Sequence, residues 1–288
     1  MKNVIRIAIP NKGVLCQPAL DMLAKAGFAS LDKPTDTLCA RCEDARVEYL
    51  FVRAQDVPKY VESGAVYAGI TGKDMLAETG CKERQVLELG FGQCDIALAV
   101  PEASRAKSVK DLAGKRIATK LPNTARVYLR QKGVNATLLE LSGATEIAPG
   151  AKLADAVIDH VQTGRTLAAN RLRKIDIIAS SSAYLVASRK KEKEAEEVLQ
   201  EIELSLAGVK RARSLKYLVL NAPSDKALKK ILQVLPSMES PTLLRLAKQG
   251  EWAVQTVVES RQLPSVVRRV KLAGGKDLLV MPLEKVIP

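Results

Sequence analysis

The chain has 288 residues, of which 47% are hydrophobic and only 3% aromatic, so it is long enough for two domains with aliphatic cores. Its formal net charge of +13 indicates an anionic partner, and charge alone does not choose between nucleic acid, a membrane surface and phosphorylated metabolites. The sequence has no apolar run near the roughly 20 residues of a membrane span and no secretory signal at its start, so we expect a cytoplasmic protein.

Cysteine usage argues against a secreted disulfide framework. The five cysteines are an odd number in the first third of the chain, which indicates reduced thiols. Cys39 and Cys42 form a CxxC pair, but no second pair or histidine follows nearby, so little favours a zinc or redox role. The single histidine, His160, is interpreted as partly buried packing.

The first two thirds of the chain alternate between short apolar strands and helices. Expected strands lie at 4–10, 47–52, 68–72, 95–100, 116–119, 136–141 and 176–180. Expected helices lie at 17–26, 55–63, 73–79, 123–132, 152–162 and, with a basic start, 189–205. This alternation predicts an α/β fold with a mainly parallel sheet, helices on both faces and ligands at the carboxyl ends of strands.

The segments 95–101 and 176–188 read as two crossings between lobes. We therefore expect a two-lobed part over residues 1–210, with lobe I at about 1–94 plus 180–210 and lobe II at about 95–179. Two such lobes enclose a cleft, a common site for small molecules. Periplasmic binding proteins share this architecture.

The segment 140–167 combines acids, hydroxyls and glycines in a pattern that core packing does not require. Small or hydroxylic residues at 142–145 and at 163–166 allow backbone N–H groups to approach an anion. The expected helix between them aligns Asp155 and Asp159 on one face, where the two charges repel unless ribose hydroxyls or a cation lie between them. The segment therefore predicts a phosphate and ribose site.

After Gly208 the pattern changes to strand, helix, strand, strand, helix, strand, with elements at 216–223, 224–234, 241–247, 252–260, 264–273 and 276–287. This is the order of a ferredoxin-like α+β unit, so we expect a separate domain over residues 211–288. It carries no paired acids and no glycine-rich phosphate loop, which favours a regulatory or assembly role over chemistry.

With these elements in place, the sequence resembles the long form of the ATP phosphoribosyltransferase family over essentially its whole length. The specific motifs are ELSGATE (140–146), EIAP (146–149), LADAVID (153–159) and TGRTL (163–167). Shorter supporting pieces are NKG (11–13), RAQDVPKYV (53–61), GITGKD (69–74), TKLPN (119–123), SPT (240–242) and LVMPLEK (279–285). The chain departs from the family pattern at Lys152, where Gly is usual, at His160, where an aliphatic residue is usual, and at Val14, where Arg is usual.

The resemblance implies transfer of a 5-phosphoribosyl group from phosphoribosyl pyrophosphate to N1 of ATP, with release of pyrophosphate and a requirement for Mg²⁺ whose protein ligands stay unassigned. The residues implied in catalysis are Asp155, Asp159 and Glu140. Those implied in binding phosphoribosyl pyrophosphate are Ser142, Gly143, Ala144, Thr145, Glu146, Asp159, Thr163, Gly164, Arg165, Thr166 and Leu167. Those implied in binding ATP or pyrophosphate are Lys12, Gly13, Arg53 and Lys120.

By the same resemblance, the C-terminal domain is expected to be ACT-like and to bind histidine as an inhibitor through Asn221, Ser240 and Thr242. Inhibition at a distance requires two global states, which in this family are dimers and hexamers without a separate regulatory subunit. The alternative is a two-lobed small-anion-binding receptor or regulator without catalytic activity. A basic nucleic-acid-binding protein would explain the charge but not the segment 140–167.

Overall fold

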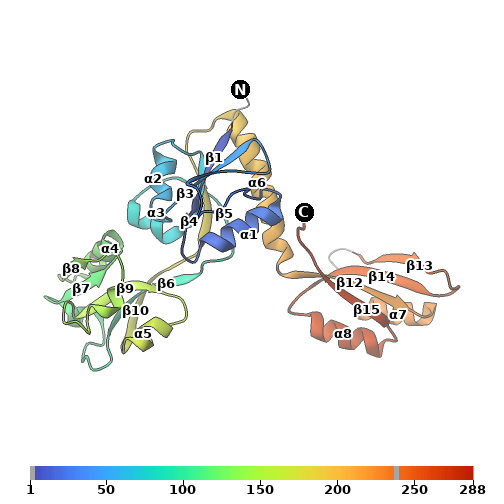
Figure 1. Cartoon of the computed structure of the whole chain (residues 1–288). Helices are drawn as coiled ribbons and strands as arrows, with labels where there is room; N and C mark the ends of the chain where they lie inside the picture. Colours follow the sequence, from blue (N-terminus) through green and yellow to red (C-terminus); the bar gives the residue numbers. More distant parts are fainter. Residues whose placement is uncertain (1–3, 237–239, 288) are drawn as a thin grey trace. The chain divides into compact units, whose positions relative to one another are not determined.

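The computed structural model describes residues 4–236 and 240–287. The chain separates into two compact units, Met1–Glu203 and Leu204–Pro288, and the boundary falls within helix α6 (Lys193–Ala212). Two β-sheets form the larger unit, and a third sheet forms the smaller unit (Figure 1). No helix in the described part of the chain is long and apolar enough to cross a membrane.

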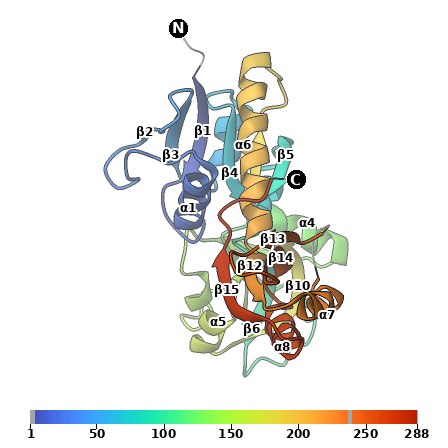
Figure 2. The ribbon, with the colours of Figure 1, turned by 90° about the vertical axis from the view of Figure 1, so that its right-hand side faces the viewer.

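The first lobe of the larger unit is built on a six-stranded sheet. Its strand order is β2 (Cys39–Arg41), β3 (Val47–Val52), β1 (Ile5–Pro10), β4 (Ala68–Gly72), β11 (Ala183–Ala187) and β5 (Arg84–Glu88). Strands β3, β1 and β4 are parallel, so their carboxyl ends meet at one edge. Its helices are α1 (Cys16–Ala26), α2 (Val57–Glu62) and α3 (Lys73–Thr79), and the part of α6 up to Glu203 runs alongside the sheet (Figure 2).

The second lobe is built on a five-stranded sheet. Its strand order is β10 (Leu172–Ser181), β6 (Cys94–Pro101), β9 (Ala156–Val161), β7 (Arg116–Thr119) and β8 (Thr137–Glu140). Strands β8, β7 and β9 are parallel, whereas β6 runs antiparallel to both of its neighbours, β9 and β10. The predicted two-lobed α/β fold is confirmed, but each lobe has its own sheet and each sheet mixes parallel with antiparallel strands.

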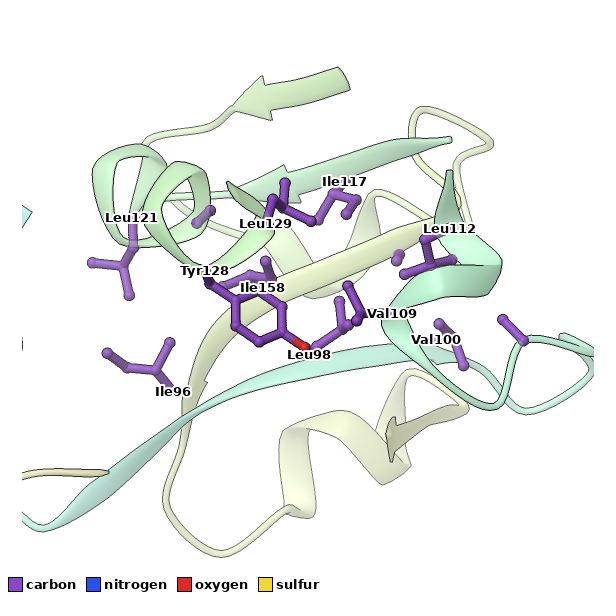
Figure 3. Packing of buried hydrophobic residues seen from close by; sticks show 13 residues of the cluster. Ile96, Leu98, Val100, Val109, Leu112, Ile117, Leu121, Tyr128, Leu129 and Ile158 are labelled. Carbon is purple, nitrogen blue, oxygen red and sulfur yellow. The ribbon is translucent and has the colours of Figure 1, made fainter. Parts of the chain in front are cut away.

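Two apolar layers cover the second-lobe sheet. On one face, Ile96, Leu98 and Ile158 pack against η1 (Val109–Leu112) and α4 (Pro122–Lys132), as Figure 3 shows. On the other face, Ala99, Ala118 and Val157 pack with residues of the connection that holds η2 (Thr145–Ile147) and of α5 (Arg165–Ala169). Because successive strand residues point to opposite faces, Ile158 and Val157 enter different layers.

The expected acidic helix at 152–162 was wrong, because residues 156–161 form strand β9. Ala156, Val157 and Ile158 are all fully buried between the two layers, and a short apolar run of a central strand has no alternation that distinguishes it from a buried helix. In an extended strand, residues four apart lie about 13 Å from each other. Asp155 and Asp159 therefore do not form a neighbouring pair. The helix expected at 189–205 lies instead at Lys193–Ala212, so the basic run precedes it.

The smaller unit confirms the predicted order of a ferredoxin-like fold. Its elements are β12 (Leu215–Ala222), α7 (Asp225–Val234), β13 (Thr242–Arg245), β14 (Trp252–Glu259), α8 (Leu263–Leu272) and β15 (Lys276–Pro282). The sheet order is β13-β14-β12-β15, with every pair antiparallel. Leu218, Ile231, Val254 and Val266 are buried at the centre of its apolar core.

Candidate functional site

A polar cavity lies where the three parallel strands of the second lobe end. Lys120 follows β7, the segment 142–146 follows β8, and residues 162–164 follow β9. The cavity has a volume of about 240 Å³ and is lined by Lys120, Ala144, Glu146, Asp159, His160, Val161, Gln162, Thr163, Gly164, Thr166 and Leu167. Ligands of open α/β sheets bind at such carboxyl ends, so the cavity is the candidate site.

The turn at residues 163–166 contributes backbone donors to this cavity. Gly164 has φ 74°, in the left-handed region that glycine adopts without a Cβ penalty. Helix α5 begins at Arg165, and N–H groups in the first turn of a helix have no acceptor within that helix. The amides of Arg165 and Thr166, together with the hydroxyls of Thr163 and Thr166, are suited to an anion.

Asp159 lies at the wall of the cavity and is held by three neighbours. Its Oδ1 accepts from the backbone N–H of His160 at 2.6 Å and lies 2.8 Å from Lys120 Nζ. Its Oδ2 accepts a short hydrogen bond from the hydroxyl of Thr145. An ionised carboxylate offers about four lone-pair positions, so Asp159 retains capacity for a ligand hydroxyl.

The electrostatics keep Asp159 ionised. Burial alone would raise the pKa of Asp159, but the hydrogen bond with His160 and the positive charge of Lys120 outweigh burial and hold this pKa well below its ordinary range. The side chain is 11% exposed, so its interactions act in a less polar environment than water. The cavity thus combines one fixed negative charge with an ammonium group beside it.

His160 was interpreted from the sequence as packing, and that interpretation missed its partners. Its Nε2 lies 2.6 Å from Oδ2 of Asp74, which belongs to α3 in the first lobe. Burial would lower the pKa of His160, but the hydrogen bonds with Asp159 and Asp74 raise it to about 9. The imidazole is therefore a cation at neutral pH. The only signal available in the sequence was a polar residue in an otherwise apolar run.

Asp74 is the last residue of the GITGKD motif, which gave no indication that Asp74 is a buried partner of His160. It is 8% exposed, and the hydroxyl of Ser181 donates to its Oδ1 at 2.5 Å. Burial would raise the pKa of Asp74, yet the hydrogen bonds from His160 and Ser181 lower it below its ordinary value. Asp74, His160 and Asp159 thus form an alternating row of charges from one lobe to the other.

Several predicted residues do not line the cavity. Ser142 and Gly143 are exposed, and Thr145 is fully buried behind Asp159. Glu140 pairs with Arg126 at 2.5 Å on the surface. Arg165 contributes its turn but is not a lining residue.

Asp155 lies at the opposite end of β9 from the cavity. Its Oδ2 accepts from the backbone N–H of Arg116 at 2.9 Å, and both residues line a separate cavity with Lys152. Lys152 is exposed with φ 61°. Glycine adopts this left-handed backbone without a Cβ penalty, so position 152 has a conformation that favours glycine.

The first-lobe cations lie at the carboxyl ends of its parallel strands. Lys12 and Gly13 follow β1, Arg53 follows β3, and the pairing of Pro10 with Val52 brings these two ends together. All three residues are exposed. The side-chain Oδ1 of Asn11 beside them is buried without a hydrogen-bond partner. Ligands bind at such strand ends, so this edge is a second polar surface suited to a small anion.

A further cavity of about 480 Å³ adjoins the candidate site, because Val161 and Gln162 line both. Its other walls include Lys73 and Ser182 from the first lobe, and Cys94 from the second. Burial raises the pKa of the Cys94 thiol to about 11, and nearby Asp74 adds to this effect. The thiol is thus protonated and unreactive at neutral pH.

In the smaller unit, the predicted histidine contacts lie on different strands. Asn221 on β12 donates to Asp277 Oδ2 at 3.1 Å, and Thr242 is the exposed first residue of β13. Strand β14 separates β12 from β13. Ser240 is exposed just before β13. The three residues therefore do not form one contiguous group.

The carboxylates of the candidate site suit a Mg²⁺ ion that is held mainly by substrate phosphates. The described residues hold no group of three or more His, Cys, Asp or Glu side chains arranged for a metal. Mg²⁺ is commonly held by one or two carboxylates together with substrate phosphates. Glu146 is a carboxylate that lines the cavity.

Fold and cavity together define the class: a two-lobed α/β protein with an anion-suited turn at the strand ends of one lobe. The sequence model of the HisG family, described as ATP phosphoribosyltransferase, matches residues 53–208, and that of the HisG C-terminal domain matches residues 212–285. The chain belongs to the ATP phosphoribosyltransferase family. It is accordingly a phosphoribosyltransferase, a glycosyltransferase of histidine biosynthesis.

Relatives of known name span the whole chain. The ATP phosphoribosyltransferase of Methanosarcina mazei is 37% identical over 291 residues, which cover 99% of this chain and 100% of the relative. That of Saccharolobus solfataricus is also 37% identical, with 100% of both chains covered.

Solved structures agree with the two-lobed architecture. A chain of the ATP phosphoribosyl transferase (HisG:HisZ) complex from Thermotoga maritima is 29% identical, with a TM-score of 0.62, and covers 71% of this chain and 99% of its own length. The substrate binding protein of an amino acid ABC transporter has a TM-score of 0.51 at 12% identity over 73% of this chain and 94% of its own. The second likeness concerns the fold alone.

Proposed function

We propose that the chain transfers the 5-phosphoribosyl group of phosphoribosyl pyrophosphate to N1 of ATP and releases pyrophosphate. The observation that carries the proposal is the cavity at the ends of β7, β8 and β9, where Asp159 and Lys120 face the turn at 163–166. Its volume of about 240 Å³ lies below the roughly 300–1,000 Å³ of pockets for drug-sized ligands. That size favours one sugar phosphate over a whole nucleotide.

The turn at 163–166 would hold the 5-phosphate through the amides of Gly164, Arg165 and Thr166. Asp159 would accept hydrogen bonds from the ribose hydroxyls on the lone pairs that its protein partners leave. Lys120 Nζ, now 2.8 Å from Asp159, has a flexible stem and would turn toward the phosphates of the bound ligand.

In the reaction, the C1–O bond to pyrophosphate breaks and the pyrophosphate keeps its electron pair, while the N1 lone pair of adenine forms the new C1–N bond. The ribose gains positive charge as the C1–O bond weakens, and a fixed carboxylate such as Asp159 stabilises that charge. Adenine N1 is already a nucleophile and no general base is needed, so positioning of the two substrates supplies most of the rate increase.

Magnesium would bind through pyrophosphate oxygens and a carboxylate such as Glu146. When bound, the ion neutralises charge on the leaving pyrophosphate. Lys12 and Arg53, at the strand ends of the first lobe, would hold the phosphates of ATP or the departing pyrophosphate. Both side chains are exposed, so they can bind phosphates when the substrates enter.

The test is to mix the protein with ATP, phosphoribosyl pyrophosphate and MgCl₂ and to follow pyrophosphate release and the ultraviolet absorbance of the adduct. We expect both signals to depend on both substrates and to disappear when magnesium is chelated. Tight binding of phosphoribosyl pyrophosphate without turnover would refute the enzyme and support a two-lobed anion receptor.

We propose further that the C-terminal unit is ACT-like, binds histidine and inhibits the two-lobed part in dimers and hexamers of this chain. Support comes from its ferredoxin-like order and from its match to the HisG C-terminal domain. Regulation would then reside on the same chain, without a separate subunit.

Thr242→Val is expected to weaken histidine inhibition several-fold, with Ser265→Ala on α8 as the matched surface control. Equal inhibition of both variants would refute a contact at Thr242.

A further inference from the structure

A buried chain of polar groups runs between the two lobes through His160. The ring Nε2 lies 2.6 Å from Asp74 on α3, and Asp74 also accepts from Ser181 at the end of β10. The backbone N–H of His160 donates to Asp159, whose other partners are Lys120 and Thr145. Asp74, Asp159, Ser181 and Thr145 are each less than 9% exposed.

Strand geometry explains why His160 points to the first lobe. Asp159 shares its face of β9 with Val157, which packs in the same layer as Leu167 of α5. His160 shares the opposite face with Ile158, which packs in the layer that contains α4 and that Met75 of α3 also contacts. Adjacent residues of one strand thus present a carboxylate to the cavity and an imidazole to the other lobe.

We infer that His160 is a positioning residue of the phosphoribosyl site: its ring ties β9 to α3 of the first lobe and so fixes Asp159 relative to the first lobe. The inference rests on the proposed function and adds a residue to it. Since a buried charge is tolerated only when it is paired, an aliphatic side chain at position 160 would leave Asp74 with Ser181 as its remaining side-chain partner. His160 lines the cavity, but its inferred role acts through Asp159, whose place it fixes.

Four ionisable groups surround the ring. Asp74 faces it from α3, Asp159 adjoins it on β9, Lys120 approaches from the end of β7, and Cys94 on β6 lies near the same two acids. Two carboxylates outweigh one ammonium and a neutral thiol, so the protonated ring is the form that joins the lobes.

The kinetic test compares His160→Gln with wild-type protein. We expect the KM for phosphoribosyl pyrophosphate to rise about tenfold, because a charge-assisted hydrogen bond is lost, while the KM for ATP changes less than twofold. His160→Leu should lose more, since glutamine keeps one donor for Asp74. The matched control is Asn123→Ala, which removes another bond between the lobes, from Asn123 Nδ2 to the backbone oxygen of Glu78 at 2.8 Å. A merely structural role would lower kcat in proportion to folded protein and leave both KM values unchanged.

A second measurement uses the fact that the chain has one histidine. In untagged protein labelled with ¹⁵N-histidine, the ring nitrogens give a single pair of resonances. We expect the protonated pattern at pH 8 in wild-type protein and a neutral ring in Asp74→Asn. Phosphoribosyl pyrophosphate should shift these resonances. A neutral ring in the wild type, or resonances indifferent to Asp74→Asn, would overturn the inference whatever the variants' stability.

Failure of the proposed function can be distinguished from failure of the positioning role of His160. If wild-type protein shows no transfer reaction, the proposed function fails, and the resonances still decide whether Asp74 holds the ring. If wild-type protein is active but His160→Gln keeps its KM for phosphoribosyl pyrophosphate, the positioning role is wrong and the proposed function stands.

Discussion

The two ends of strand β9 carry the same kind of chemistry in different surroundings. At the carboxyl end, Asp159 lines a cavity and pairs with Lys120 Nζ. At the amino end, Asp155 lines another cavity and accepts from the backbone N–H of Arg116. Only the carboxyl end also receives the segments that follow β7 and β8, because the three strands are parallel. An aspartate in a cavity is therefore not a site by itself, and the convergence of three strand ends distinguishes the site at Asp159.

The largest expected effect comes from removing the aspartate charge at each end of β9, which tests whether only the carboxyl end is functional. Asp159→Asn is expected to lower kcat/KM for phosphoribosyl pyrophosphate by about 10²–10³, the size of effect seen when one preorganised electrostatic group is lost. Asp155→Asn, the matched control four residues away, should stay within twofold of wild type. Steady-state pyrophosphate release measures both. Comparable losses in the two variants would show that the ends of β9 are not functionally different.

A second effect concerns stability and its dependence on pH at the carboxyl end. Although burial would lower it, hydrogen bonds with Asp159 and Asp74 raise the pKa of His160 from 6.5 to about 9. The protonated ring therefore stabilises the fold fully below pH 6.5, by at most about 3 kcal/mol, and this contribution is lost as the pH rises through 9. Urea unfolding should show His160→Gln less stable than wild type at pH 6, with the difference shrinking by pH 10. A difference that stays constant over this range would contradict the ion pair.

A smaller effect is expected when a hydroxyl in the turn after β9 is removed, compared with removal of a hydroxyl at the start of β8. Thr166→Val removes a hydroxyl that lines the cavity, and the KM for phosphoribosyl pyrophosphate should rise about tenfold, as for a lost hydrogen bond to a charged group. Thr137→Val makes the same change at the amino end of β8 and should leave this KM unchanged. Steady-state kinetics at saturating ATP provide the check, and equal KM values for the two variants would refute contact at Thr166.

Local sequence patterns predicted the order of strands and helices well where apolar and polar residues alternate or where turn residues mark the ends of elements. The strands at 47–52 and 68–72 were predicted with their observed bounds, and the ferredoxin-like order of the smaller unit was confirmed. Strand β9 was predicted as a helix because it is buried on both faces, so its sequence lacks the alternation of apolar and polar residues typical of a strand. Strand β5 was missed because its side chains are largely half-buried and mostly polar.

The site was predictable only as far as its parts are contiguous in sequence. The turn at 163–166 and Asp159 were singled out, since small, hydroxylic and acidic residues cluster there. The contact between His160 and Asp74 was not predicted, because 86 residues separate them and no sequence motif links the two. Contacts between lobes depend on tertiary structure, which a single sequence does not display.

The smallest expected effect lies at the amino end of β9, at Lys152. Its φ of 61° costs an L-residue roughly 1 kcal/mol relative to glycine, and its recorded hydrogen bonds, from its N–H to Pro149 and from Arg116 to its oxygen, use backbone atoms that glycine keeps. Lys152→Gly should therefore raise the free energy of unfolding by up to about 1 kcal/mol, less the entropy that glycine adds to the unfolded chain. Activity should not change, because the residue lies at the end of β9 away from the cavity. A loss of affinity for phosphoribosyl pyrophosphate in this variant would place the ammonium of Lys152 in the substrate's electrostatic field and would undo the distinction between the two ends.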